Sequence, residues 1–167
     1  QLIRTSLDNE ANPINAIAAE FNLRSVSTYN PNRVSSIIFQ MVARFCWSRN
    51  TEITEDFIPK WVVGLGSEDK SYLISHSALL WEFVTNPPPN FPVKLPIRDY
   101  HVIKYASLHR FKIPTYFSQL IVDESHDLSE AMLEIIERSS QGYVGLGDHF
   151  QAVNSYSAKR TSPAIER

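Results

Sequence analysis

Cysteine is almost absent from this sequence of 167 residues, and the one present, Cys46, has no partner for an internal disulfide. A chain without disulfides is typical of a reducing compartment, and we expect Cys46 to be a small buried apolar residue on a helix. The five histidines are scattered, and none forms an H-x-x-x-H pair. Neither residue type therefore predicts a zinc site.

Long apolar runs and excess charge are missing too. No stretch approaches the roughly 20 apolar residues of a membrane span, and no signal peptide is predicted. The net charge of −2 excludes a strong basic field, so any contact with nucleic acid would depend on a local patch. With 43% hydrophobic and 20% charged residues, the composition is that of a globular protein. We expect it in the cytoplasm, or the nucleus of a eukaryote, with no membrane partner.

The first two thirds of the sequence carry mostly helical signals. Asn30-Pro31 favours a helix start, and the apolar stripe that follows predicts an amphipathic helix over residues 31–49. Shorter helices are expected over residues 76–85 and 99–108. The proline-rich segment 86–96 between them cannot be helical.

The pattern changes near residue 116. Gln119–Asp123 is a short apolar run that predicts a buried strand, and Gly142–Gly147 predicts a second one. Leu128–Ser139 between them is amphipathic, with Ser129 as a fair N-cap. Strand, helix and strand in about 30 residues predict a parallel sheet with a right-handed crossover, hence an α/β fold. The chain divides into a mostly helical lobe and a parallel-sheet unit, residues 1–115 and 116–167.

Acidic side chains follow both predicted strands. Asp123, Glu124 and Asp127 follow the first strand, and Asp148 and Gln151 follow the second. The carboxyl ends of parallel strands face the ligand crevice of a sheet. Nucleotide hydrolysis needs one carboxylate for Mg²⁺, another for the attacking water, and a neutral group that senses the γ-phosphate. The alternative is that these acids are solvated loop residues.

The loop that holds nucleotide phosphates is absent. No G-x-x-x-x-G-K-[ST] motif occurs, and the Gly64-Leu65-Gly66 turn is not followed by Lys-Ser/Thr. The 167 residues are therefore not expected to form a complete ATP site. We expect them to be an internal segment of a longer protein.

Two motifs resemble those of the UvrD-like superfamily 1 DNA helicases. Leu120–Asp127 (LIVDESHD) resembles the Walker B motif, a hydrophobic strand followed by D-E-x-Q-D. Gly147–Tyr156 (GDHFQAVNSY) resembles the next motif, G-D-x-x-Q-x-I-Y-x-F-R-G-A. Upstream segments resemble the inserted helical lobe of the F-box DNA helicase branch: Phe45–Ser48, Ile53, Ile58-Pro59, Leu80-Trp81 and Asp99–Leu108.

The resemblance implies a helical lobe followed by a partial RecA-like unit, in a motor that couples Mg-ATP hydrolysis to 3′–5′ movement on DNA. It places Mg²⁺ at Asp123 through water, and makes Glu124 the base for the attacking water. It makes Gln151 the sensor of the γ-phosphate and assigns Asp148 to nucleotide coupling. Expected partners are DNA, single-stranded or at a duplex junction, and the rest of the motor, with ATP and Mg²⁺ as cofactors.

Several residues depart from the family pattern. His126 stands where the family has Gln; a role as metal ligand is the alternative for it. Asn154 replaces a Tyr that stacks on DNA bases, and Ser157 and Ala158 replace Arg and Gly. Tyr156 keeps an aromatic ring that could stack on a base, with buried packing as the alternative.

Phosphate contacts are expected from a local basic patch, the alternative being a solvated helix face. The patch comprises Arg98, Lys104, His109, Arg110 and Lys112. Two other functions stay open. One is a degenerate helicase-like domain that binds DNA or protein without catalysis. The other is an unrelated α/β domain, phosphotransfer or receiver-like, that uses Mg²⁺ at the two adjacent acids.

Overall fold

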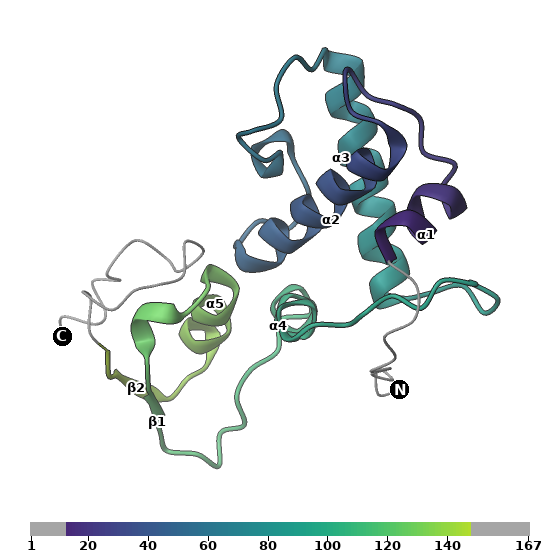
Figure 1. Ribbon diagram of the computed structural model, residues 1–167. Helices are drawn as coiled ribbons and strands as arrows, with labels where there is room; N and C mark the ends of the chain where they lie inside the picture. The colour runs from purple at the N-terminus through teal and green to yellow at the C-terminus, as the bar shows by residue number, and fades with distance from the viewer. Residues whose placement is uncertain (1–12, 148–167) are drawn as a thin grey trace. The chain divides into compact units, whose positions relative to one another are not determined.

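The computed structural model describes residues 13–147, which form two compact units. Within that range the first unit takes residues 13–45 and 50–101, and the second takes residues 46–49 and 102–147. The fold is a mixture of helices and one small parallel sheet, which agrees with the α/β class (Figure 1). The elements are α1 (Pro13–Glu20), α2 (Pro31–Trp47), η1 (Glu55–Phe57), α3 (Ser67–Thr85), α4 (Asp99–Leu108), β1 (Gln119–Val122), η2 (Ser125–Asp127), α5 (Glu130–Arg138) and β2 (Gly142–Gly145).

Helix α2 supplies much of the core of the first unit. The Asn30 side chain accepts a hydrogen bond from the Arg33 N–H at 2.9 Å, and Pro31 occupies the first helical position, where no N–H is needed. The helix predicted over residues 31–49 is confirmed, with its last residue at Trp47. Its apolar stripe is fully buried: Val34, Ile37, Ile38, Met41, Val42 and Phe45.

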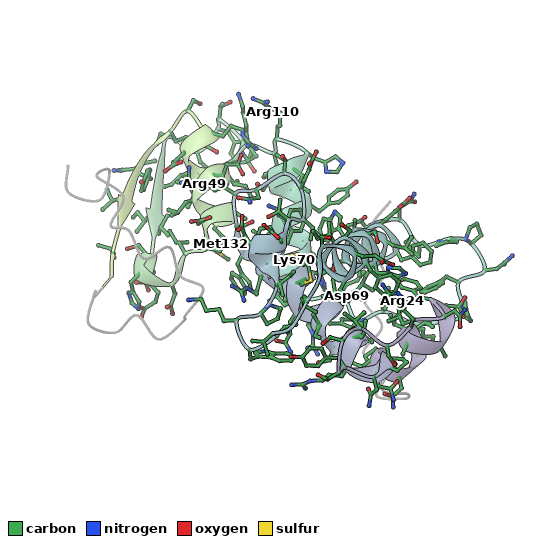
Figure 2. The ribbon with its side chains drawn as sticks, turned by 90° about the horizontal axis from the view of Figure 1, so that it is seen from above. Arg24, Arg49, Asp69, Lys70, Arg110 and Met132 are labelled. Carbon is green, nitrogen blue, oxygen red and sulfur yellow. The ribbon has the colours of Figure 1, made fainter. Side chains whose placement is uncertain are left out.

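Helix α3 is longer than its sequence pattern predicts. The expected start at residue 76 is wrong, because the helix begins at Ser67. Its first turn carries Glu68 and Asp69, whose charges favour a helix N-terminus. Asp69 also pairs with Arg24 at 3.3 Å (Figure 2). The start of α3 was missed in the sequence because this polar first turn lacks the spacing of apolar residues that indicates a helix.

The second unit contains the strand–helix–strand motif that the sequence predicts. Strands β1 and β2 are parallel neighbours, with Gln119 opposite Gly142 and Val122 opposite Gly145. Ser129 caps α5 as expected, since its side chain accepts a hydrogen bond from the Met132 N–H at 3.2 Å. Cys46, in the same unit, is buried and free, which confirms its expected role.

The prediction that β1 is a buried strand is wrong, because one face of the strand is exposed and the other is only half-buried. Residues alternate between exposed and half-buried along both strands. Helix α5 lies against one side of the sheet (Figures 1 and 2). Ile121 on β1 and its neighbour Val144 on β2 point the other way and are 73% and 44% exposed. An apolar run alone does not show how many faces are covered.

No helix within residues 13–147 combines the length and apolarity that a membrane crossing requires.

Candidate functional site

The carboxyl ends of β1 and β2 lie side by side and are joined beyond the sheet. The Leu146 N–H donates to the Val122 carbonyl at 2.8 Å, and the Ser125 N–H donates to the Leu146 carbonyl at 2.8 Å. The turn after β1 is thereby fastened to the segment after β2. Asp123 and Glu124 lie at this rim, on the strand adjacent to the one that leads to Gly147.

Glu124 has an unusual backbone conformation. Its φ of 52° and ψ of 41° place it in the left-handed helical region, just before the short helix η2. Its N–H donates to the Asp123 carboxylate at 2.9 Å. A left-handed residue other than glycine costs about 1–2 kcal/mol, and such residues cluster at functional sites. The turn therefore holds two adjacent acids in a strained, defined geometry.

His126 lies in η2, directly after this turn, and its ring faces the Glu124 carboxylate. The His126 side chain is only 5% exposed, that of Glu124 is 66% exposed, and Nε2 lies 3.3 Å from Oε2. The other side of the ring abuts Gly147, where a Cβ would lie 2.8 Å from His126 Nδ1 and 2.8 Å from Ser125 Oγ. Glycine is needed here because a larger residue would displace the ring or the turn. The sequence does not show that His126 faces Glu124 or fits against Gly147, although the Gly147-Asp148 pair after the second strand is part of a recognisable motif.

The donor set at the rim suits a hydrated Mg²⁺ ion. Mg²⁺ commonly keeps several waters and binds one or two carboxylates together with substrate phosphates. Asp123 follows β1 directly, and one oxygen of Asp127 is buried without a hydrogen-bond partner in the described structure. Among residues 13–147 no three His, Cys, Asp or Glu side chains converge as a metal cage. His126 as a metal ligand accordingly gains no support, and its carboxylate neighbour is Glu124.

Several predicted site residues lie outside the described residues. They are Asp148, Gln151 and Tyr156, together with the departures at Asn154, Ser157 and Ala158. The described part of the site therefore consists of the residues after β1 together with Leu146 and Gly147 after β2.

Lys104 does not belong to an exposed basic patch, and the prediction that it contacts DNA phosphate is wrong. The residue has no exposed surface, and its ammonium donates to the Ser48 carbonyl at 2.8 Å. Burial lowers the pKa of Lys104 to about 8 and raises the pKa of the neighbouring Cys46 thiol. Lys104 was grouped with basic residues because they lie close together in the sequence, which does not show that its side chain faces inward.

The basic segment after α4 remains exposed. His109, Arg110 and Lys112 are all exposed, and Arg110 has a left-handed φ of 55°. They belong to the second unit, whereas Arg98 belongs to the first. His109, Arg110 and Lys112 are therefore the exposed part of the predicted patch on the second unit, and Arg98 is exposed on the first.

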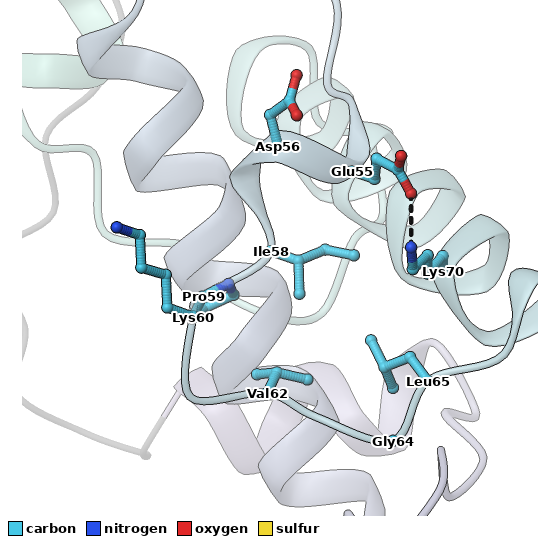
Figure 3. A pocket seen from close by; sticks show the side chains of 9 residues that line it. All are labelled: Glu55, Asp56, Ile58, Pro59, Lys60, Val62, Gly64, Leu65 and Lys70. Carbon is cyan, nitrogen blue, oxygen red and sulfur yellow. Dashed lines mark hydrogen bonds and ion pairs between the residues drawn. The ribbon is translucent and has the colours of Figure 1, made fainter.

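A cavity of about 370 Å³ lies in the first unit and shares no lining residue with the carboxylate rim (Figure 3). An ion pair of 2.9 Å between Lys70 and Glu55 crosses one side of it. Two lysines and two carboxylates line it, so its charges balance and favour no anion. The lining residues are Glu55, Asp56, Ile58, Pro59, Lys60, Val62, Gly64, Leu65 and Lys70.

No family model, no curated protein and no solved structure matches this chain.

Proposed function

We propose that this chain carries the water-activating half of the nucleotide site in a UvrD-like superfamily 1 DNA helicase motor, within a RecA-like sheet. The observation that supports this most strongly is the rim itself. Asp123 and Glu124 follow a strand that pairs in parallel with the next strand of the same βαβ unit. Ligand sites of open α/β sheets lie at such carboxyl ends.

Each residue of the rim has a defined role in the proposal. Asp123 would hold Mg²⁺, which when bound would neutralise charge on the nucleotide phosphates. Glu124 orients the attacking water and accepts its proton. The exposure of Glu124, 66% for the side chain, leaves its carboxylate accessible to water. A positioned general base contributes a rate factor of about 10²–10⁴. The phosphate-binding loop would come from another part of the complete polypeptide.

In this proposal the exposed basic segment after α4 is the part of the chain that contacts DNA. Arg110 would bind backbone phosphate, while Lys104 is enclosed and would not. Arg110→Glu should weaken binding of single-stranded DNA severalfold and lower its dependence on salt. Lys104→Met, which removes an enclosed cation of the same unit, should leave binding unchanged in protein that remains folded. Equal affinities for both variants and the wild type would place the DNA contact elsewhere.

Hydrolysis is tested with the complete polypeptide, Mg²⁺ and single-stranded DNA. Glu124→Gln keeps the size of the side chain and removes the base. The rate of ATP hydrolysis should fall about 10²–10⁴-fold. Negligible turnover in both the wild type and Glu124→Gln would favour the non-catalytic binding domain instead.

A further inference from the structure

We propose that His126 is a positioning residue that holds the Glu124 carboxylate in the direction from which it activates water. This inference rests on the proposed function, since it gives Glu124 a partner in the same reaction. His126 stands where the resembling helicases have Gln, and its imidazole Nε2 lies 3.3 Å from Glu124 Oε2.

The two side chains differ sharply in freedom. The exposed Glu124 carboxylate, standing alone, would sample several rotamers, and fixing a long side chain carries an entropic cost. The His126 ring is enclosed, being only 5% exposed. A fixed ring beside a mobile carboxylate selects one orientation of that carboxylate when Nε2 carries a proton to donate.

Gly147 fixes the ring from its other side. A Cβ at this position would lie 2.8 Å from His126 Nδ1 and 3.1 Å from the His126 backbone nitrogen. The ring therefore has little room to withdraw from Glu124. The segment after β2 thus leaves no space for a side chain behind the ring that contacts the base after β1, so Gly147, His126 and Glu124 lie in sequence across the rim.

Kinetics on the complete polypeptide separate positioning from packing. His126→Phe keeps a ring in the enclosed site and removes the N–H, while His126→Gln keeps an N–H donor. His126→Phe should lower kcat about 10- to 100-fold with KM for ATP unchanged, because a misplaced catalytic group costs rates of that order. His126→Gln should retain kcat within about threefold. Gly147→Ala, which displaces the ring, should lower kcat in the direction of His126→Phe.

A second readout needs no turnover. In the ¹⁵N-labelled chain, Glu124→Ala should shift the Nε2 resonance of His126, whereas Glu137→Ala on α5 should leave it unchanged. If neither variant moves that resonance, the pairing is absent and the inference fails, whatever the ATPase shows.

The two proposals fail in different ways. Loss of turnover in Glu124→Gln with full kcat in His126→Phe overturns the positioning role and leaves the hydrolytic function standing. Unchanged turnover in Glu124→Gln overturns the hydrolytic function, and the positioning of a base falls with it. A low kcat in both His126→Phe and His126→Gln overturns the donor role, because a retained N–H should rescue the rate.

Discussion

Glu124→Asn should stabilise the chain while removing its proposed activity. Glu124 has φ 52° and ψ 41°, a left-handed conformation that costs an ordinary residue about 1–2 kcal/mol. Asparagine tolerates this conformation much better, because its short side chain forms local hydrogen bonds. Against that gain stands the loss of the Glu124–His126 contact at 3.3 Å, which has one partner 66% exposed. Such pairs contribute about 0–1 kcal/mol.

The net effect is a rise in the free energy of unfolding of about 1 kcal/mol, within a range of about 0–2 kcal/mol. Urea denaturation, followed by circular dichroism at pH 7, measures it. Glu124→Ala is the matched control, because alanine loses the same contact and keeps the backbone strain. It should be less stable than Glu124→Asn by about 1 kcal/mol. If the asparagine variant is no more stable than the alanine variant, the left-handed turn stores no strain and the reasoning is refuted.

Three further predictions concern buried polar groups. Burial, together with the nearby Arg98 charge, lowers the pKa of His101 from 6.5 to about 4, so the folded state favours the neutral ring. The free energy of unfolding therefore falls as the pH falls from 6.5 to 4, because only the unfolded chain takes up the proton in that range. Urea unfolding should show a loss of up to about 3 kcal/mol over that range, absent in His101→Gln. Burial lowers the pKa of Lys104 from 10.5 to about 8. The cost of burying the charged ammonium in the folded state is therefore removed as the pH rises from 8 to 10.5. Stability relative to Lys104→Met should increase by up to about 3 kcal/mol there, and a flat difference would contradict the burial. Ser129→Ala should cost about 1 kcal/mol in urea unfolding at pH 7, because the Met132 N–H loses its cap, and no loss would show that water replaces the cap.

The secondary structure of the second unit follows closely from sequence. The apolar runs and the Ser129 cap predicted a strand, a helix and a strand, and all three are present. Parallel pairing followed from the strand–helix–strand spacing, because the intervening helix must cross back over the sheet. Local patterns were sufficient here since each element has its own periodicity and boundary signals.

Contacts between distant residues could not be predicted in the same way. The inward direction of Lys104 depends on the carbonyl of Ser48, which lies 56 residues earlier in the chain. The exposure of Ile121 depends on which face of the sheet α5 covers. A sequence shows what a residue prefers, while neighbours supplied by the fold decide where it lies.

The candidate site was predicted by type but not by geometry. Asp123 and Glu124 stand out because they follow an apolar strand, and the structure places them beside the end of the next strand. The left-handed backbone of Glu124 and the fit of His126 against Gly147 were not predicted. Both depend on a turn closed by the Leu146 backbone, which no single-residue preference encodes.

The rate of Mg²⁺-dependent ATP hydrolysis by the complete polypeptide, measured with single-stranded DNA for the wild type and for Glu124→Gln, tests the central claim most directly. Glu124 as the base predicts turnover in the wild type and a fall of about 10²–10⁴-fold in the variant. Equal rates in the two proteins would contradict the assignment of the rim after β1 as a hydrolytic site.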